Sequence, residues 1–292
     1  MHFSIIIPTY NRAKIIEATI RSVLRQTFDN YEIIIVDDGS TDTTADVIKI
    51  NSSEKIKYFY KQNEERSVAR NYGANKAQGN YLIFLDSDDE MLTNHLQNIY
   101  TFLKQQNFQP VFICTGYSVV NPNGKVVSAF SKKGVFDKKN LLYGNYLGCS
   151  PVVVKADVFR RFQFNPDRKL LVLEDWDLWL RIISELNLYC LPAKTIIIKN
   201  HNDRSVLGAS PDQLVNRITY FKQHILKNAQ LFSYSKLNKN LFLMGIYSYT
   251  ALHIALTKSR RLLAIKYLLM AIFTHPGILF KKRFGGIIKQ LL

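Results

Sequence analysis

The sequence contains little cysteine. Its 292 residues include three cysteines, Cys114, Cys149 and Cys190, which are far apart and show no C-x-x-C spacing. An odd number of widely spaced cysteines argues against a disulfide framework and against a zinc site. We therefore expect a protein of a reducing compartment, the cytoplasm.

Two glycine-rich motifs are also missing. Neither G-x-G-x-x-G nor G-x-x-x-x-G-K-[ST] occurs, which argues against a dinucleotide-binding fold and against a P-loop ATPase. The N-terminus has no basic segment before its first apolar run, and Pro8 interrupts that run. We interpret the run as a first β-strand and not as a signal peptide.

Long apolar runs are absent, and acidic residues are scarce in the last third of the chain. The two most apolar stretches, 241–256 and 262–273, fall short of the ~20 residues that a membrane-spanning helix needs. From Pro211 to Leu292 there are thirteen Lys or Arg residues and one acid, Asp212. This segment therefore carries +12 of the total formal charge of +16.

Basic residues stand beside apolar ones in the segments 258–261 and 280–292. This pattern favours helices that lie on an anionic membrane surface, where each cation contributes roughly 1 kcal/mol. Nucleic-acid binding is the rival interpretation, but no recognised motif accompanies the basic residues, so we expect no nucleic-acid partner. We predict a peripheral association with the inner face of the cell membrane.

The first 90 residues show a regular alternation of short apolar runs and helical patterns. The runs predict strands at 3–7, 31–38, 55–60 and 80–86, and the segments between them predict helices at 12–26, 42–51 and 65–79. Near-continuous Ile, Val, Leu and Phe is typical of strands buried on both faces. The alternation predicts an α/β fold of Rossmann-like type, with a mostly parallel central sheet flanked by helices.

Beyond residue 90 the alternation is less regular. A helix is expected at 95–106, a strand at 110–120 and an amphipathic helix at 171–186, with two short strands after it. From residue 211 onward the segments are helical in pattern. We therefore expect a helical C-terminal extension.

Acidic side chains are concentrated where two of the predicted strands end. "VDDGSTD" follows the strand at 31–38 and "LDSDD" follows the strand at 80–86. The carboxyl ends of parallel strands meet at one edge of a sheet, where ligands bind. Helix N-capping would explain one such acid, but two clusters at neighbouring strand ends favour a divalent cation with oxygen ligands, Mg²⁺ or Mn²⁺. A calcium loop starting at Asp86 is disfavoured, because Gln97 stands where the loop needs Glu.

Four segments together resemble a known enzyme family. "SIIIPTYNR", "IIIVDDGSTD", "SVARNYGANKAQGNYLIFLDSDD" and "LEDWDLWLR" resemble the inverting glycosyltransferases of family 2, which have the GT-A fold. The resemblance implies a nucleotide-diphosphate sugar as donor, expected to be a UDP-sugar, and Mg²⁺ or Mn²⁺ as cofactor. It also implies that a hexosyl or hexosaminyl group passes to a hydroxyl of a glycan or lipid-linked saccharide, as in cell-surface polysaccharide or glycolipid synthesis.

The resemblance divides the chain and assigns roles to its residues. Residues 1–210 correspond to a catalytic domain, with a nucleotide-binding half at 1–90 and an acceptor half at 91–210, and 211–292 form the basic extension. The residues matched to donor binding are Pro8, Thr9, Tyr10, Asp38, Arg66, Arg70, Asp86, Ser87, Asp88 and Arg204. Asp88 and His201 are matched to the metal, Asp175 to the catalytic base with Glu174 beside it, and Trp176 to the acceptor side.

Two other functions are compatible with parts of this pattern. A sugar-phosphate nucleotidyltransferase needs a Gly-rich N-terminal loop with Arg, whereas the first strand here ends in "PTYNR". A nucleotide-sugar-binding protein without catalysis would not need both Asp88 and Asp175. The chain also departs from the family where "FQFNPDRKL" replaces the usual Gly-Phe-Asp-Glu pattern before Glu174.

Overall fold

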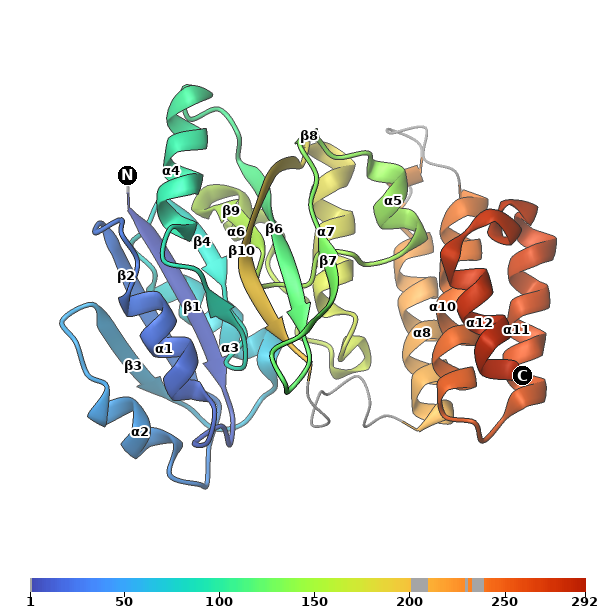
Figure 1. Cartoon of the computed structure of the whole chain (residues 1–292), viewed down its shortest axis with the longest axis horizontal. Coiled ribbons are helices and arrows are strands. Elements are labelled where there is room, and N and C mark those ends of the chain that lie inside the picture. Colours follow the sequence, from blue (N-terminus) through green and yellow to red (C-terminus); the bar gives the residue numbers. More distant parts are fainter. Residues whose placement is uncertain (1, 201–209, 229–230, 233–238) are drawn as a thin grey trace. The chain divides into compact units, whose positions relative to one another are not determined.

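The chain folds into two compact units in a computed structural model, which describes residues 2–200, 210–228, 231–232 and 239–292. The first, here called the sheet unit, comprises residues 1–136, 147–166 and 186–202. The second, the helical unit, comprises residues 137–146, 167–185 and 203–292. Figure 1 shows the elements of both units along the chain.

One ten-stranded sheet unites the described strands of the sheet unit. Its order is β3-β2-β1-β4-β9-β6-β10-β5, with β7 paired to β6 and β8 to β10. The strands are β1 (Phe3–Thr9), β2 (Tyr31–Asp37), β3 (Ile56–Tyr60), β4 (Tyr81–Phe84), β5 (Glu90–Met91), β6 (Phe112–Val120), β7 (Val126–Phe130), β8 (Gly134–Val135), β9 (Val152–Lys155) and β10 (Tyr189–Lys199). The neighbours β3, β2, β1 and β4 are parallel, whereas β9 runs antiparallel to both β4 and β6. The expected α/β fold with a mostly parallel sheet is confirmed.

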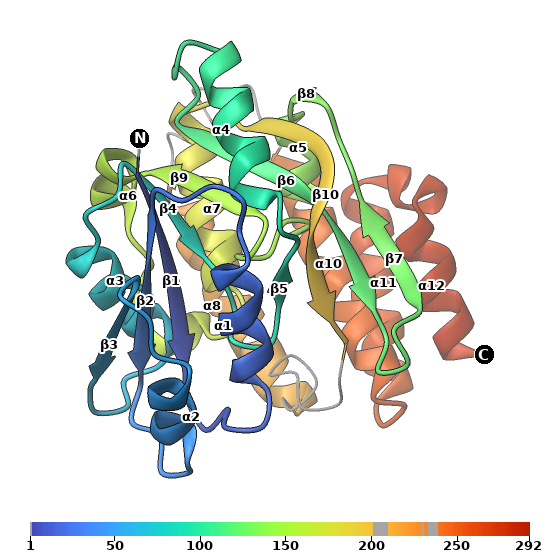
Figure 2. The same ribbon diagram turned by 60° about the vertical axis from the view of Figure 1, so that its left-hand side comes forward.

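One face of the sheet is covered by α1 (Ile16–Leu24), α2 (Thr44–Ile50) and α4 (His95–Gln105). Alternate residues of a strand point to the same side, so Ile5 and Ile7 of β1 face these helices together. They share a buried cluster with Ile20 of α1, Ile48 of α2 and Ile99 of α4. Figure 2 shows α1 and α4 in front of the strands.

The other face is covered by α3 (Arg66–Lys76) and α6 (Ala156–Phe162). A Cβ at Gly73 of α3 would lie 2.6 Å from Cγ2 of Ile6, so only glycine lets this helix approach β1 so closely. Phe84 of β4 packs against Phe159 of α6, with ring centroids 4.8 Å apart. Helices on both faces explain why the central strands are apolar along their whole length.

The helical unit is built around α7 (Glu174–Glu185), which Trp176 anchors. The Trp176 ring packs against Phe221, Phe242 and Tyr249. The unit also contains α5 (Lys138–Tyr143), η1 (Arg168–Leu170), α8 (Pro211–Leu226), α10 (Lys239–Leu256), α11 (Arg261–Thr274), η2 (Pro276–Phe280) and α12 (Lys282–Leu291). These elements confirm the expected C-terminal helices.

Arg283 of α12 is a basic residue with a structural role inside the helical unit. Its guanidinium donates hydrogen bonds to the carbonyl oxygens of Tyr143 at 2.9 Å and Gly245 at 3.2 Å, and it lies over the Tyr143 ring. It thereby connects α12 to α5 and α10. Among the described residues, no helix is both long enough and apolar enough to cross a membrane.

A buried carboxylate joins β1, β2 and β3. Glu32 accepts hydrogen bonds from Ser4 Oγ at 2.6 Å, Lys57 Nζ at 2.7 Å and the backbone N–H of Gln78 at 2.7 Å. Burial alone would raise the pKa of Glu32, but the hydrogen bonds from Lys57, Ser4 and Gln78 outweigh it and hold the pKa below its ordinary value of 4.5. The carboxylate therefore stabilises the fold in its charged form.

We predict that Glu32→Gln lowers the free energy of unfolding at pH 7 by about 1–3 kcal/mol, because the charge-assisted hydrogen bonds of a buried carboxylate are lost. A group with a lowered folded pKa contributes stability above its unfolded pKa and loses it as the pH falls through the folded pKa. The wild type should therefore lose stability as the pH falls below 4.5, and Glu32→Gln should show a smaller loss. Urea unfolding at several pH values measures this, with Glu54→Gln as the exposed control; equal pH profiles for wild type and Glu32→Gln would contradict it.

Candidate functional site

The ends of β1, β2 and β4 bring three loops to one edge of the sheet. The three strands are parallel neighbours, with β1 in the middle, so the loops after Thr9, Asp37 and Phe84 leave on the same side. The sequence-predicted residues Tyr10, Asp38, and Asp86 to Asp88 lie in these loops, and Pro8 and Thr9 are the last two residues of β1. The structure therefore brings together these sequence-predicted residues of the donor site.

The loop after β1 is bonded to the loop after β2. Asn11 Oδ1 accepts a hydrogen bond from the N–H of Thr41 at 2.8 Å, and the Asn11 N–H donates to Ser40 Oγ at 2.9 Å. Asn11 has a φ of 52°, in the left-handed region that Asn tolerates. Next to this bend, Tyr10 is 47% exposed, while the Thr9 hydroxyl is buried and has no hydrogen-bond partner among the described residues.

The two acids at the end of β2, Asp37 and Asp38, have different surroundings. Asp37 accepts hydrogen bonds from the N–H of Ser40 and from the Tyr58 hydroxyl, both within the protein. Asp38 Oδ1 accepts from Lys61 Nζ at 2.7 Å and from the N–H of Glu64 at 3.1 Å. Both carboxylates are buried. Asp37 therefore shapes the turn, and Asp38 is held by Lys61.

Arg70 is a buried cation paired with the first acid of the cluster after β4. Its side chain is 2% exposed, its Nη2 lies 2.6 Å from Asp86 Oδ1, and its guanidinium stacks over the Phe164 ring. The partner, Asp86, is 38% exposed. Arg70 thus fixes one oxygen of Asp86 from inside the protein. Arg66, at the first position of the same helix, is half-buried.

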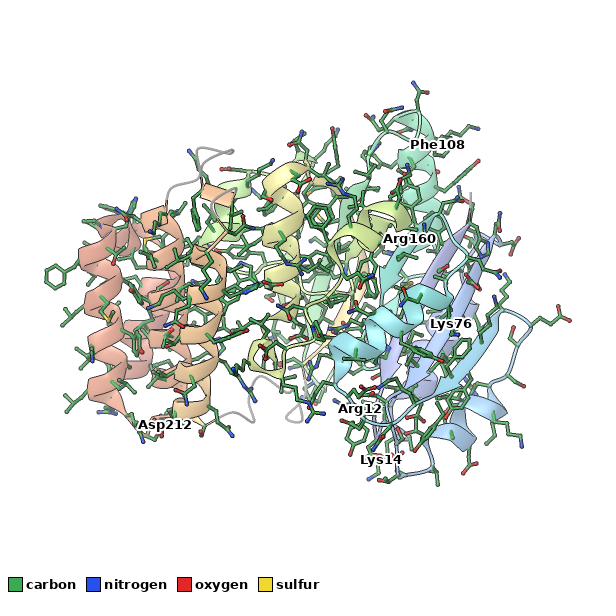
Figure 3. The ribbon with its side chains drawn as sticks, turned by 180° about the vertical axis from the view of Figure 1, so that it is seen from behind. Arg12, Lys14, Lys76, Phe108, Arg160 and Asp212 are labelled. Atoms are coloured by element: carbon green, nitrogen blue, oxygen red, sulfur yellow. The ribbon has the colours of Figure 1, made fainter. Side chains whose placement is uncertain are left out.

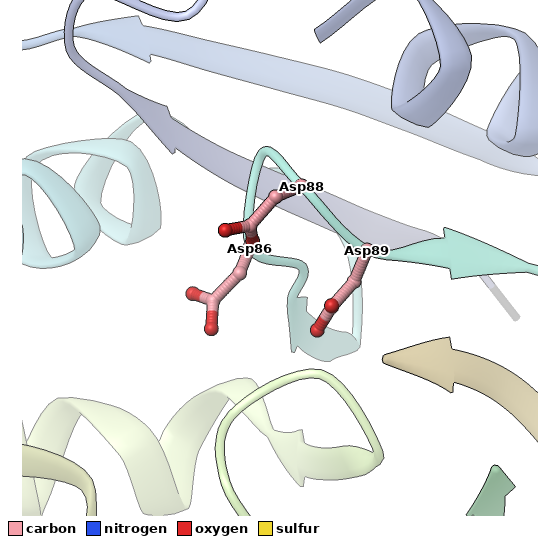
Figure 4. A group of neighbouring side chains, drawn as sticks. All are labelled: Asp86, Asp88 and Asp89. Atoms are coloured by element: carbon pink, nitrogen blue, oxygen red, sulfur yellow. The ribbon is translucent and has the colours of Figure 1, made fainter. Parts of the chain in front are cut away.

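The turn between β4 and β5 carries three carboxylates at close range. One oxygen each of Asp86, Asp88 and Asp89 lies within 4.8 Å of the other two; Figure 4 shows the three side chains on this turn. Ser87, between them, is buried. Clustered carboxylate oxygens are the ligand set that Mg²⁺ and Mn²⁺ prefer. The residues present therefore fit a divalent cation, with Asp86 and Asp88 on the more exposed side.

Asp89 is the inward acid of the cluster. It is 5% exposed, and its oxygens accept hydrogen bonds from Ser150 Oγ at 2.6 Å and from the Lys199 N–H at 3.3 Å. Burial raises the pKa of Asp89 well above its ordinary value, and the charges of Asp86 and Asp88 raise it further. Asp89 therefore attaches the turn to β10 and to the segment before β9.

Ser150 and Thr19 are contacts of this turn that the sequence did not reveal. The Ser150 hydroxyl accepts from the Asp86 N–H at 3.2 Å while it donates to Asp89. The Thr19 hydroxyl of α1 lies 3.0 Å from the carbonyl oxygen of Ser87 and 2.8 Å from that of Asp89. Both contacts join residues more than 60 positions apart, and no local sequence signal marks either one.

The remaining sequence-predicted acids lie in the helical unit, at the start of α7. Asp175 is half-buried and accepts a hydrogen bond from the N–H of Trp176 at 2.7 Å, and Glu174 is 3% exposed. Acids in a first helical turn interact favourably with the helix dipole. Trp176 is 1% exposed, and its indole N–H donates to the carbonyl oxygen of Leu141 at 2.6 Å. The indole thereby fixes the first turn of α7 against α5.

Tyr249 of α10 lies near these acids. Burial raises the pKa of Tyr249 to about 12, and the nearby charges of Asp175 and Glu174 act in the same direction. Arg283 has the opposite effect on the same hydroxyl. The charges at the start of α7 thus act on a buried hydroxyl of α10. His201 and Arg204, the other sequence-predicted site residues, lie outside the described residues.

Comparison with known proteins identifies the family to which the chain belongs. A family model described as "Glycosyl transferase family 2" matches residues 4–154. The GalNAc(5)-diNAcBac-PP-undecaprenol beta-1,3-glucosyltransferase of Campylobacter jejuni is 30% identical over 278 residues, which are 88% of this chain and 87% of the relative. Three rickettsial proteins named uncharacterized glycosyltransferases are longer, and this chain's matches cover 35%, 40% and 21% of their lengths.

Two solved structures share the fold. S. aureus TarS 1–349 in complex with UDP-GlcNAc gives a TM-score of 0.65 at 18% identity, over 98% of this chain and 92% of that chain. The mannosyltransferase PcManGT of Pyrobaculum calidifontis, in complex with GDP-Man and Mn²⁺, gives 0.60 at 14% identity, over 99% and 85%. The family model, the Campylobacter relative and the shared fold lead to one conclusion: this chain belongs to glycosyl transferase family 2 and has the GT-A fold.

Proposed function

We propose that the chain is a metal-dependent inverting glycosyltransferase, which moves a hexosyl or hexosaminyl group from a UDP-sugar to a hydroxyl of a lipid-linked saccharide. The observation that carries this proposal is the cluster of Asp86, Asp88 and Asp89 at the end of β4. It lies beside the loops after β1 and β2, at the sheet edge where nucleotides bind in such folds. The UDP-GlcNAc bound by TarS supports a UDP-sugar, and the name of the Campylobacter relative supports an undecaprenol-linked acceptor.

The donor would be held by the loops after β1, β2 and β4 and by the first turns of α3. We propose that Pro8, Thr9 and Tyr10 contact the base and ribose, and that Asp38 accepts a hydrogen bond from the base. The buried Thr9 hydroxyl without a described partner supports a polar ligand there. The other proposed donor contacts are Arg66, Arg70, Asp86, Ser87, Asp88 and Arg204. In this proposal Arg70 acts through the oxygen of Asp86 that it holds.

A divalent cation would be held by Asp88, with His201 as a second proposed ligand. When bound, such a cation neutralises charge on the diphosphate as it leaves. The Mn²⁺ in the PcManGT complex supports this choice of cofactor. Asp86 would remain with Arg70, and Asp89 with Ser150 and Lys199. The protein thus supplies fixed partners for the acids on either side of Asp88.

We propose Asp175 as the base that takes the proton of the acceptor hydroxyl, on the strength of the family resemblance. Asp175 is partly exposed at the first turn of α7, where a substrate could approach its carboxylate. Glu174 beside it is buried and is the alternative base. The indole of Trp176, which holds the same turn, would act on the acceptor side by keeping Asp175 in position.

In this proposal residues 1–210 form the catalytic domain, and the basic region 211–292 keeps a cytoplasmic enzyme at the inner face of the membrane. The direct test uses the purified chain, UDP-[¹⁴C]glucose or UDP-[¹⁴C]GlcNAc, Mn²⁺ and an undecaprenyl-diphosphate-linked saccharide, with and without acceptor. Label in the lipid fraction that depends on acceptor supports the proposal. Binding of UDP-sugar without transfer to any lipid-linked or free saccharide would contradict it and favour a binding protein.

We predict that UDP binds at least about tenfold more tightly with Mn²⁺ than with EDTA, because a cation held by Asp88 would neutralise the charge of the diphosphate; tenfold corresponds to ~1.4 kcal/mol. Asp88→Asn should remove this dependence on metal. Isothermal titration calorimetry measures both values. Asp29→Asn, an exposed acid at the opposite end of β2, is the control and should behave as wild type. Equal UDP affinity in Mn²⁺ and EDTA would contradict the metal site.

Ser150→Ala should weaken the metal-dependent part of UDP binding without touching a proposed ligand. The change removes the hydroxyl that joins the Asp86 N–H to Asp89, which should cost about 1–3 kcal/mol of stability and loosen the turn that carries Asp88. The measurement is the ratio of UDP affinities in Mn²⁺ and EDTA, next to urea unfolding. Ser128→Ala on exposed β7 is the matched control. Lower stability with an unchanged ratio would show that Ser150 does not position the metal ligands.

Asp175→Asn should leave UDP-sugar affinity nearly unchanged but lower the rate of transfer by ~10²–10⁴, the usual contribution of a general base. The reason is that the donor and metal contacts proposed above come from other residues. Single-turnover transfer, with donor affinity measured on the same preparation, separates binding from turnover. Near-normal transfer would exclude Asp175 as the base, and a large loss in Glu174→Gln would then identify Glu174.

A further inference from the structure

Helix α11 is apolar on two sides, and the described structure covers only one of them. On the inner side, Ala264, Leu268 and Ala271 are buried. They pack in clusters with Ala255, Ala251 and Met244 of α10, respectively. These contacts bury the inner side of the helix.

The outer side of α11 carries a row of exposed apolar side chains. Leu262 is 83% exposed, Ile265 39%, Leu269 46% and Phe273 84%. The spacing of three, four and four residues places these side chains on one face of a helix. We call these four residues the α11 face. Single exposed apolar residues need no explanation, but an aligned row of this kind is typical of an interaction surface.

Further exposed apolar groups and several cations follow along the chain. Leu279 and Phe280 of η2 are 45% and 91% exposed. Arg261 and Lys266 on α11 are exposed, as are Lys281 and Lys282 directly after Phe280. None of these four cations has an acidic partner within its own helical segment, because no Asp or Glu occurs after Asp212.

The acid of this region is already paired. Asp212, which Figure 3 labels at the start of α8, accepts two hydrogen bonds from the Arg260 guanidinium, at 2.6 and 2.8 Å. In a homodimer formed by the α11 faces of two copies, the cations of one copy would lie against those of the other. No carboxylate after residue 212 could pair with them. The charge therefore disfavours a homodimer through this face and favours a negatively charged partner with an apolar layer.

We propose that the α11 face, together with Phe280, inserts into the surface of an anionic lipid bilayer, with Arg261, Lys266, Lys281 and Lys282 at the level of the lipid headgroups. Helices that lie in the membrane plane combine an apolar face with flanking cations in this way. The inference deepens the proposed membrane location by naming its surface. It does not depend on the proposed chemistry.

The experiment is co-sedimentation of the full chain with phosphatidylcholine vesicles and with vesicles containing 30 mol% phosphatidylglycerol. We expect binding to the anionic vesicles, and a loss of at least about tenfold in the partition coefficient for the double variant Leu262→Ser/Phe273→Ser, since each side chain loses apolar burial. Ile50→Ser, which removes an 80% exposed apolar residue of the sheet unit, is the matched control and should bind as wild type. Lys281→Gln/Lys282→Gln should lower binding to the anionic vesicles and leave binding to neutral vesicles unchanged.

UDP affinity, measured on every variant, distinguishes failure of this proposal from failure of the proposed function. The α11 variants should bind UDP with Mn²⁺ as the wild type does. Vesicle binding that is unchanged in Leu262→Ser/Phe273→Ser, or equal on neutral and anionic vesicles, would overturn the proposal. A dimer in sedimentation velocity that the same double variant dissociates would also overturn it, because the occupant of the α11 face would then be a second copy.

Discussion

The structure around the turn after β4 has to stabilise three carboxylates, with one oxygen of each within 4.8 Å of the others. Like charges this close repel, so each needs a compensating group or burial in a neutral form. Arg70, buried and stacked on Phe164, compensates Asp86. Ser150 and the N–H of Lys199 bind Asp89. The acids on both sides of Asp88 therefore have fixed positions, which would preorganise the turn for the proposed cation.

The topology of the sheet supplies the groups that hold the acidic turn in place. The parallel strands β1, β2 and β4 place three loops at one edge, but a parallel sheet alone would leave the acidic turn supported from one side. The antiparallel strand β9 runs beside β4, so that Ser150, just before it, reaches the turn. The chain leaves the turn through β5, which pairs with β10, the strand that ends at Lys199. The turn is thus anchored at its start, its middle and its end.

The sequence predicted the parts of this arrangement that depend on neighbours in the chain. The apolar runs of β1, β2 and β4, and the acids at the ends of β2 and β4, are local patterns, so both the sheet and the position of the cluster could be predicted. Ser150 could not, because its contact with Asp89 joins residues 61 positions apart and depends on the register of β9. The burial of Trp176 under Phe221 depends on helix α8 in the same way. The two short strands expected after α7 form the single strand β10. Its pairing with β6 shifts register on both sides of Lys194, so the residue pattern of β10 is not that of one regular strand.

The central claim is that the turn after β4 holds a divalent cation against a nucleoside diphosphate. The most direct measurement is anomalous X-ray scattering from Mn²⁺ in crystals grown with Mn²⁺ and UDP. We expect one strong peak at coordination distance from an Asp88 oxygen and from the diphosphate, with Asp89 still bonded to Ser150 and not to the metal. Well-defined UDP beside the loops after β1 and β2, with no anomalous peak at Asp88, would contradict it.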